Sequence, residues 1–515
     1  MKKKLRRKVS KILKIILIVL SLVLIFLSIY IRKSFGDLSF EQLLYSLTTS
    51  TGTSLSSVLE GFIFVGLFSL GGCLFIKGLS WIWKNIKYSV YFVVQVGKWK
   101  FRIMFFNVIK NFLFVCFVGF AIVFSGNYLG FFEYVELQLN SSTLFEDYYV
   151  DASEVEFKFP SKKKNLIYIV VESLEGTLMS IESGGAEEVS YIPNLEKMAS
   201  DNISFSNSDK LGGLYIQSGN SWTAGALVSH TAGVPLKISI NGNAYSGYGS
   251  FLPGVYSIGE VLDKNGYHNY FMLGSKAKFG GRKEYFEDHG NYEIMDYYWA
   301  IENGKISEDY YMWWGYEDVK LYEFAKQELL EISQNNEPFN FTMLTADTHF
   351  FDGYVGDNCP IVFEEQYVNA FYCTDMMIND FINWIKEQDF YQDTVIVITG
   401  DHLTMQNNFF ENITTYDRVV YNTFINTGIS KVNSRNRKTS TMDLYPTTLA
   451  ALGVEIPGDR LGLGTNLFSN KKTLLEELGS VIFNEELEKR SNFYNNQLLK
   501  DTYYEMEKEK DGSES

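Results

Sequence analysis

Acidic and imidazole side chains follow two apolar runs of the sequence, at the point where each run ends. The run Asn165–Val171 leads directly into Glu172. The run Thr394–Thr399 leads, one glycine later, into Asp401 and His402. Both runs have the length and β-branched composition of strands buried on both faces. Ligands gather beyond the carboxyl ends of strands in open α/β sheets, so this set predicts a site for a hard or borderline divalent metal. Singly, each residue is more often a turn or cap residue.

A hydroxyl group is the third candidate. In Asn220–Pro235, a polar lead-in after glycine-rich sequence predicts a helix that starts near Ser221–Thr223. The helix dipole and the free backbone N–H groups at such a start favour a phosphate beside the hydroxyl of Thr223. The alternative is that Thr223 merely caps its helix, and composition alone favours that interpretation.

The elements that must position these residues alternate along the chain. Besides the two runs above, Gly266–Met272 and Phe339–Leu344 have the character of strands. Helical patterns lie between the runs, at Tyr316–Ile332, Phe363–Gln388 and Ser440–Leu452. This alternation predicts an α/β domain with a central, mostly parallel sheet.

Charge is divided unevenly along the 515 residues. Residues 1–150 hold 17 Lys/Arg and 7 Asp/Glu, whereas residues 151–515 hold 29 and 54. The acidic C-terminal part would repel a polyanion, which argues against a nucleic-acid partner.

Three apolar stretches in the first part have nearly the length needed to cross a bilayer as helices, at about 12–31, 56–76 and 111–132. The N-terminus is strongly basic, and the loop 77–110 has seven basic and no acidic residues. Both should therefore lie in the cytoplasm, which places everything after Phe132 outside the cell. The first stretch is longer than a usual signal-peptide core and lacks a cleavage site, so we expect an anchor.

The run Tyr88–Gly97 is the uncertain part of this topology. Its ten apolar residues are too few to span a bilayer, and the flanking tryptophans suit an interfacial helix. A fourth span there would put the large domain inside the cell.

We expect four parts in the chain. A transmembrane region covers 1–132, a connector 133–162, a catalytic domain 163–483, and a charged C-terminal helix or tail 484–515. Cys359 and Cys373 both lie in the exported domain, where either a disulfide or two free thiols would fit.

Five short motifs occur in a fixed order: Glu172–Thr177, Trp222–Ser229, Gly233–Leu236, Ala346–His349 and Thr399–His402. The ordered set resembles the lipoteichoic acid synthase and phosphoglycerol transferase family, within the sulfatase/alkaline phosphatase superfamily. It is most similar to transferases that decorate periplasmic glucans, which also carry the pattern of Asp347–Gly353 followed by a cysteine pair. The resemblance covers residues 163–470 and implies a sulfatase-like extracellular domain.

Carried over position by position, the resemblance implies that Glu172, Thr223, Asp401 and His402 hold one divalent metal. The family usually uses Mn²⁺, with Mg²⁺ or Zn²⁺ as alternatives. Thr223 would be the nucleophile and would form a covalent phosphothreonine. Chemistry agrees, because a threonine hydroxyl has a very high pKa and needs a metal to stabilise its alkoxide.

The resemblance also implies substrate contacts. His349 matches a substrate-side histidine, and Arg282 matches an arginine that binds the phosphoglycerol head group. Lipoteichoic acid synthases have a tryptophan two positions before that arginine, whereas this chain has Gly280. The remaining candidates are Lys276 and Lys278, for phosphoryl oxygens, and Trp314, for stacking on a sugar.

The donor implied by the family is phosphatidylglycerol, with diacylglycerol as the leaving product. The acceptor would be a cell-envelope polysaccharide, a glycolipid or a teichoic-type polymer. Anchoring would keep the catalytic domain at the membrane plane where the donor is concentrated. Two rivals remain: a phosphoethanolamine transferase with the same threonine chemistry, and a non-catalytic envelope scaffold or sensor with the same fold.

Overall fold

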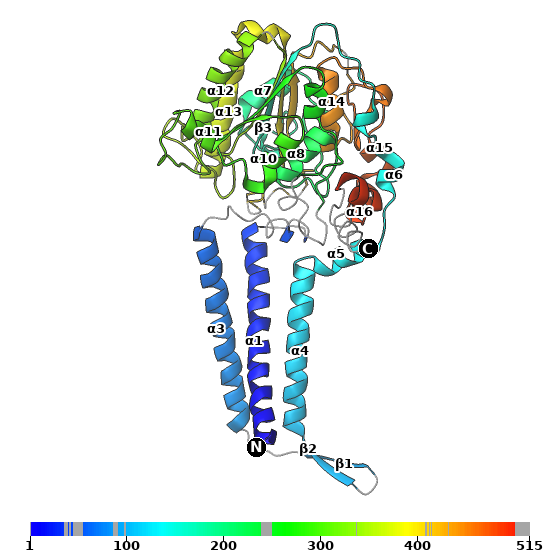
Figure 1. Cartoon of the computed structure of the whole chain (residues 1–515). Helices are drawn as coiled ribbons and strands as arrows, with labels where there is room; N and C mark the ends of the chain where they lie inside the picture. The colour runs from blue at the N-terminus through cyan, green and yellow to red at the C-terminus, as the bar shows by residue number, and fades with distance from the viewer. Residues whose placement is uncertain are drawn as a thin grey trace, which may run out of the picture. The chain divides into compact units, whose positions relative to one another are not determined.

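The computed structural model describes residues 2–35, 40, 43–44, 55–85, 91–96, 99–237, 250–335, 337–406, 409–410, 413, 415–430 and 432–499. The chain forms two compact units, one from segments 1–40 and 51–136 and the other from 41–50 and 137–515. Figure 1 shows the elements of both units.

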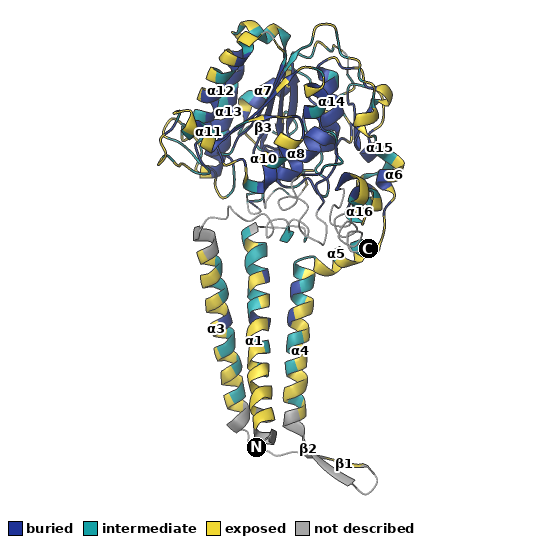
Figure 2. Cartoon of the chain, in the orientation of Figure 1, coloured by how far each residue is buried: buried dark blue, intermediate teal, exposed yellow. Residues whose placement is uncertain are grey.

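Long apolar helices dominate the first unit: α1 (Lys2–Phe35), α3 (Leu55–Asn85) and α4 (Phe105–Tyr128). Among the residues that the structure describes, the segments long and apolar enough to cross a membrane are Lys8–Ser34, Leu59–Ile82 and Val108–Tyr128. Their leucine, isoleucine and phenylalanine side chains are largely exposed (Figure 2), as in helices whose solvent is lipid. The protein is therefore a membrane protein with a soluble C-terminal domain.

A hairpin occupies part of the region between α3 and α4. Strand β1 (Tyr91–Val96) pairs antiparallel with β2 (Trp99–Met104), and Val96 lies opposite Trp99. The interfacial helix and the fourth helical span that we considered for Tyr88–Gly97 are thus both wrong for residues 91–96. Aromatic and β-branched residues on both sides of Gly97 favour paired strands over a helix.

A six-stranded sheet forms the centre of the second unit, with the strand order β5-β4-β6-β3-β7-β8. All neighbouring strands are parallel except β7 and β8, which confirms the predicted fold class. The bounds are β3 (Asn165–Val171), β4 (His268–Leu273), β5 (Glu293–Met295), β6 (Phe339–Leu344), β7 (Thr394–Gly400) and β8 (Asn422–Ile425).

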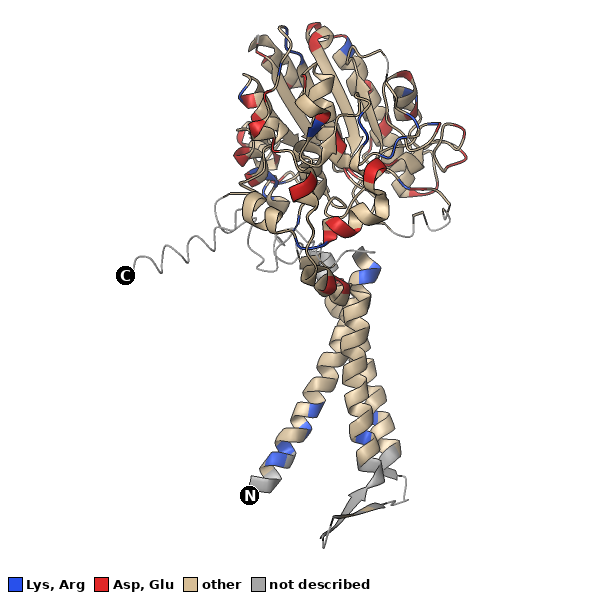
Figure 3. Ribbon diagram, turned by 90° about the vertical axis from the view of Figure 1, so that its right-hand side faces the viewer, with Lys and Arg blue, Asp and Glu red and all other residues tan. Residues whose placement is uncertain are grey.

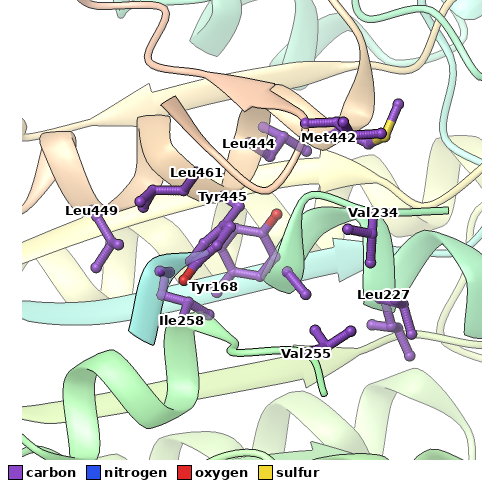
Figure 4. Packing of buried hydrophobic residues seen from close by; sticks show 14 of the residues in the cluster. Tyr168, Leu227, Val234, Val255, Ile258, Met442, Leu444, Tyr445, Leu449 and Leu461 are labelled. Carbon is purple, nitrogen blue, oxygen red and sulfur yellow. The ribbon is translucent and has the colours of Figure 1, made fainter. Parts of the chain in front are cut away.

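The two faces of this sheet are both buried, because successive side chains of a strand point to opposite faces. In β3, Tyr168 and Val170 belong to one core cluster, whereas Ile169 and Val171 belong to the other. Figure 4 shows part of the first cluster, where Tyr168 packs among leucine and valine side chains. A strand buried on both faces reads as a continuous apolar run, which explains why β3 was predicted with its observed bounds.

Helices cover both faces. Those whose side chains join the first cluster are α8 (Thr223–Ala232), α9 (Ile258–Asp263), α10 (Arg282–Asp288), α14 (Leu444–Ala451), α15 (Leu474–Leu478) and α16 (Ser480–Glu488). Those that join the second are α7 (Pro193–Asp201), α11 (Tyr297–Glu302), α12 (Asp318–Ile332) and α13 (Gln366–Lys386). A short pair, β9 (Arg460–Leu461) and β10 (Gly464–Thr465), stands apart from the main sheet.

Two terminal segments of this domain differ from expectation. Helix α5 (Phe131–Leu139) runs across the expected boundary at residue 132, and α6 (Leu144–Tyr148) lies inside the expected connector. The charged C-terminal helix expected from residue 484 instead begins at Ser480 and ends at Glu488, so the expected boundary lies inside α16. Residues beyond it pack inward, because Tyr494 is fully buried and its hydroxyl donates to the carbonyl of Pro235.

Candidate active site

Three side chains converge at the carboxyl ends of β3 and β7. Val171 pairs with Gly400, so Glu172 and Asp401 leave the sheet side by side. One ligand atom each from Glu172, Asp401 and His402 lies within 4.8 Å of the other two. All three side chains are almost completely buried. The structure thus brings together the three residues that the sequence singled out.

Gly400 is required by a close backbone contact beside this cluster. A Cβ atom at this position would lie 1.8 Å from the carbonyl oxygen of Leu174, in the turn that follows Glu172. Any side chain at residue 400 would therefore push apart the two turns that carry the carboxylates. The spacing between Glu172 and Asp401 is set by backbone packing.

Thr223 adds a hydroxyl to the same cluster. It is the first residue of α8, and the N-cap residue is Trp222, which makes no side-chain capping bond. The Thr223 Oγ1 atom lies 3.3 Å from Oε2 of Glu172 and 3.4 Å from Nε2 of His402. The hydroxyl therefore faces the cluster, at a helix start whose free N–H groups carry partial positive charge.

The spacing of these atoms fits a divalent cation. The His402 Nε2 atom also lies 3.3 Å from Oδ2 of Asp401 and 3.4 Å from Oε1 of Glu172. Ligands about 2.1 Å from a shared tetrahedral ion lie about 3.4 Å from one another. Within the described part of the chain, Oδ2 of Asp401 is buried and has no hydrogen-bond partner. Oxygen ligands with one imidazole nitrogen are the chemistry of such a site.

The electrostatics of the cluster also favour a bound cation. Burial opposes the charge on Glu172, but the nearby His402 and His349, together with hydrogen bonds from Ser173 and Thr223, outweigh it and lower the pKa of Glu172. Burial, and then the charge of Glu172, raise the pKa of Asp401 to about 7. Burial also opposes charge on His402, yet Asp401 and Glu172 raise its pKa. Two carboxylates this close need a positive partner, and a bound cation would supply it.

Ser173 and a backbone carbonyl orient these groups. The Ser173 N–H donates to Oδ1 of Asp401 and its hydroxyl donates to Oε1 of Glu172, both at 2.8 Å. The Nδ1 atom of His402 lies 2.8 Å from the carbonyl oxygen of Leu403. Because a carbonyl only accepts, Nδ1 carries the proton, and Nε2 of the neutral ring keeps its lone pair for the cluster.

His349 lies beside the cluster with an aromatic and a cationic neighbour. Its ring centroid is 4.6 Å from that of Trp314, and its Nδ1 lies 2.6 Å from the carbonyl oxygen of Phe350. Burial lowers the pKa of His349, the charge of Glu172 opposes this, and Arg282 adds to it. Arg282 and Trp314, both predicted substrate contacts, therefore lie in the same part of the molecule as His349.

Lys276 and Lys278, which were also predicted to contact the substrate, have other surroundings than Arg282 and Trp314. Lys276 directs its ammonium group toward the rings of Tyr297, Tyr298 and Tyr311, 5.3 to 5.8 Å from their centroids. Lys278 is exposed. Lys276 therefore has aromatic neighbours, and its contact with phosphoryl oxygens stays a prediction.

A sequence profile with the description Sulfatase matches residues 164–454. The chain belongs to the sulfatase family. Curated relatives called phosphoglycerol transferase I, from Escherichia coli K12 and Shigella flexneri, are 30% identical over 337 residues. The match covers 64% of this chain but only 41% of each relative, so the chain spans less than half of their length.

Two solved structures show a weaker likeness to this chain. The lipoteichoic acid synthase LtaP from Listeria monocytogenes is 21% identical with a TM-score of 0.47, over 61% of this chain and 79% of that one. The phosphoethanolamine transferase EptA from Neisseria meningitidis is 10% identical with a TM-score of 0.46, over 84% and 83%.

Sequence reasoning missed two carboxylates beside this sulfatase-family site. Asp318, the first residue of α12, accepts hydrogen bonds from the N–H groups of Ala346 and Asp347, both at 2.9 Å. Asp347 accepts in return from the N–H of Asp318 at 3.1 Å. This reciprocal pair, the Asp318–Asp347 clamp, holds the start of the loop that carries His349. The only sequence signal for Asp318 was an acidic residue at a helix start, which the helix dipole already explains.

A second missed group stabilises the turn after His402. Glu175 is fully buried and accepts from the guanidinium of Arg418 and from the N–H of Thr404. Glu175 lies in the same motif as Glu172, three positions later, and this spacing was its only signal in the sequence.

Cys359 and Cys373 form a disulfide, with Cα atoms 5.4 Å apart. Cys373 lies in α13, whereas Cys359 lies in the loop that follows His349. The bond therefore ties that loop to a helix of the second core. The other two cysteines, Cys73 and Cys116, are free and lie in α3 and α4.

Proposed function

We propose that this protein is a membrane-anchored phosphoglycerol transferase. It would move sn-glycerol phosphate from phosphatidylglycerol to a cell-envelope glycan or teichoic-type acceptor. The observation that carries the proposal is the Thr223 hydroxyl, within 3.4 Å of both Glu172 and His402 at the start of α8. The names of the curated relatives support the same reaction class.

In the first step, the Thr223 hydroxyl gives up its proton and its oxygen, Oγ1, attacks the phosphorus of the lipid phosphodiester. The bond between phosphorus and the diacylglycerol oxygen breaks, and that oxygen takes up a proton as diacylglycerol leaves. The glycerol phosphate is then held as a phosphodiester on Thr223. In the second step an acceptor hydroxyl attacks the phosphorus and gives its proton to a base such as His349, and the Thr223 oxygen leaves and takes up a proton again.

Glu172, Asp401 and His402 would hold one divalent metal together with Thr223. The bound ion would lower the pKa of the threonine hydroxyl and offset charge on the phosphoryl oxygens. Three oxygens and one nitrogen suit Mn²⁺, with Mg²⁺ and Zn²⁺ as the alternatives to test.

His349 and Arg282 would act on the substrate side. The lowered pKa of His349 keeps its imidazole neutral at pH 7, so it could take the acceptor proton or donate to a phosphoryl oxygen. Arg282 contributes a fixed positive charge near His349, suited to the phosphate of the head group. Both roles are proposed because the charge of Arg282 acts on His349, so the two side chains lie in the same part of the site.

We infer an extracellular or periplasmic catalytic domain. Basic residues at the N-terminus and in the segment between α3 and α4 favour the cytoplasm for both, and three crossings then leave the C-terminal domain outside. The disulfide between Cys359 and Cys373 supports an oxidising compartment.

The test is to incubate the full chain, reconstituted in lipid vesicles, with glycerol-labelled phosphatidylglycerol and Mn²⁺. We expect label on the peptide that contains Thr223 and release of diacylglycerol, both abolished in Thr223→Ala and by EDTA. Thr231→Ala, on the same helix, is the matched control and should retain the label. Release of diacylglycerol from phosphatidylethanolamine but not phosphatidylglycerol would favour the phosphoethanolamine rival. Absence of label from either lipid would favour a scaffold.

A further inference from the structure

A group of tyrosines around one lysine lies on the surface next to the candidate active site. The Nζ atom of Lys276 lies 5.7, 5.3 and 5.8 Å from the ring centroids of Tyr297, Tyr298 and Tyr311. Tyr298 and Tyr311 are 50% and 52% exposed, whereas Tyr297 is buried and forms the floor. We call these four residues the tyrosine platform.

The platform is held in place before any ligand arrives. Tyr297 contacts both exposed rings edge-on, with centroids 5.4 Å from Tyr298 and 5.6 Å from Tyr311. Its hydroxyl donates to the carbonyl of Tyr310 at 2.7 Å. The Tyr310 hydroxyl in turn lies 2.8 Å from the carboxylate of Glu317. A surface ordered in this way loses little conformational entropy on binding.

Backbone and side-chain contacts connect the platform to the site. Arg282 donates to the carbonyl of Lys276 at 3.0 Å. Tyr311 lies three residues before Trp314, a distance of at most about 10 Å along the chain, and the Trp314 ring packs on His349. The platform therefore lies close to His349 and Arg282 of the candidate active site.

The charge of the platform contrasts with the rest of the domain. Acidic residues are spread over the C-terminal domain (Figure 3), and residues 151–515 carry 54 acidic against 29 basic residues. Among the described residues, no ion pair neutralises Lys276. Its interaction with Tyr298 raises its pKa, so it stays positive. The platform thus combines two half-exposed rings with an unneutralised cation.

We propose that the tyrosine platform binds the saccharide acceptor of the proposed transfer reaction. Sugar rings would stack on Tyr298 and Tyr311, and hydroxyl or phosphate oxygens of the glycan would accept hydrogen bonds from Lys276. Tyrosine suits such a ligand because its ring has an apolar face and a polar edge. This inference rests on the proposed function and names the acceptor side of the same site.

The composition of the platform favours a saccharide over a lipid surface. Elsewhere on this chain, the surfaces suited to lipid consist of exposed leucine, isoleucine and phenylalanine, as in α1, α3 and α4. Tyr298, Tyr311 and Lys276 include none of these residue types. A polyhydroxylated ligand can use both the rings and the ammonium group, whereas acyl chains would leave the ammonium without a partner.

The experiment measures binding separately from catalysis. The full chain in detergent micelles, carrying Thr223→Ala to prevent turnover, is applied to an array of oligosaccharides of glucose, galactose and N-acetylglucosamine. We expect binding to at least one of them. The Tyr298→Ala/Tyr311→Ala variant should weaken that binding by about tenfold or more, and Lys276→Met should weaken it less. Tyr372→Ala on α13 and Lys197→Met on α7 are matched controls and should bind as the parent does.

Two results would overturn the inference. One is a parent protein that binds no saccharide on the array, and the other is a double variant that binds as tightly as the parent. Labelling of Thr223 by phosphatidylglycerol, measured without acceptor, tests the proposed function on its own. A double variant that lost this labelling but kept glycan binding would show that the platform serves the lipid donor instead.

Discussion

Two groups of buried carboxylates lie at the same edge of the sheet, and they differ in what surrounds them. Glu172 and Asp401 follow β3 and β7 and converge with an imidazole and a hydroxyl. Asp318 and Asp347, beyond the end of β6, instead accept hydrogen bonds from backbone N–H groups of the adjacent loop. Among the described residues, only the first group has three ligand atoms within 4.8 Å of one another. Burial of acids alone therefore does not indicate a metal site, whereas convergence with a nitrogen ligand does.

The largest expected effect comes from Asp401→Asn. The variant removes a charged ligand from the cluster, so we expect the affinity for Mn²⁺ to fall by more than about 100-fold, beyond the range typical of outer-shell changes. Calorimetric titration of the EDTA-treated full chain measures this. The matched control is Asp347→Asn, which should bind the ion as the wild type does. An equal loss of Mn²⁺ affinity in the two variants would contradict the assignment of the metal site to the first group alone.

Asp318→Ala tests the other group. It leaves the half-buried N–H of Ala346 and the buried N–H of Asp347 without an acceptor, so we expect a loss of about 2 kcal/mol in unfolding free energy. Denaturant unfolding of the full chain in detergent, followed by tryptophan fluorescence, measures the change. Affinity for Mn²⁺ should stay the same in the folded variant. A stable variant with weakened metal binding would instead assign Asp318 to the metal site.

Ser173→Ala tests how the carboxylates of the candidate metal site are positioned. The serine hydroxyl orients Glu172, and loss of such a contact lowers metal affinity by about tenfold or more. Its N–H bond to Asp401 is a backbone bond and survives the change. The same titration provides the measurement, with Ser183→Ala as the control, because this half-buried serine also donates to a glutamate, Glu196. Unchanged affinity would show that the backbone bond alone positions the ligands.

The smallest effect concerns pH. Burial, and then the charge of Asp318, raise the pKa of Asp347 well above its usual value. A carboxyl group whose pKa rises on folding contributes most stability below its unfolded pKa of about 4, and the contribution is lost as pH rises through the folded pKa. Asp347→Asn removes this dependence. We therefore expect the stability of the variant relative to wild type to increase by about 1 kcal/mol between about pH 5 and pH 8.

Thermal unfolding at a series of pH values measures this difference. Asp201→Asn, on the surface of α7, provides the control and should track the wild type. A difference between Asp347→Asn and wild type that stays constant across the range would contradict the expected burial of a protonated carboxyl group.

Local pattern was enough to predict much of the fold and the centre of the site. The bounds of β3 and β6 follow from apolar runs, and Glu172 and Asp401 follow from what comes directly after such runs. The start of α8 near Thr223 follows from its polar lead-in. These signals are local, because strand and helix periodicity depends on neighbouring residues.

What could not be predicted depends on contacts between distant segments. The role of Asp318 rests on backbone N–H groups 28 and 29 residues away, which leave no mark in the sequence. The direction of Lys276 depends on three tyrosines contributed by other segments. The hairpin at β1 and β2 was missed because we weighed its apolar run only as a helix, although β-branched and aromatic residues on both sides of Gly97 favoured strands.

The close approach of Gly400 to Leu174 should restrict the size of the ion that the candidate metal site accepts. The two turns that bear Glu172 and Asp401 touch through their main chains, so the opening between the carboxylates cannot widen without separating β3 from β7. Calcium prefers oxygen atoms at about 2.3–2.6 Å and six to eight of them, which calls for a roomier and more pliable cage. We therefore expect a small transition-metal or magnesium ion to be retained when calcium is present in excess, by virtue of a glycine that contributes no ligand.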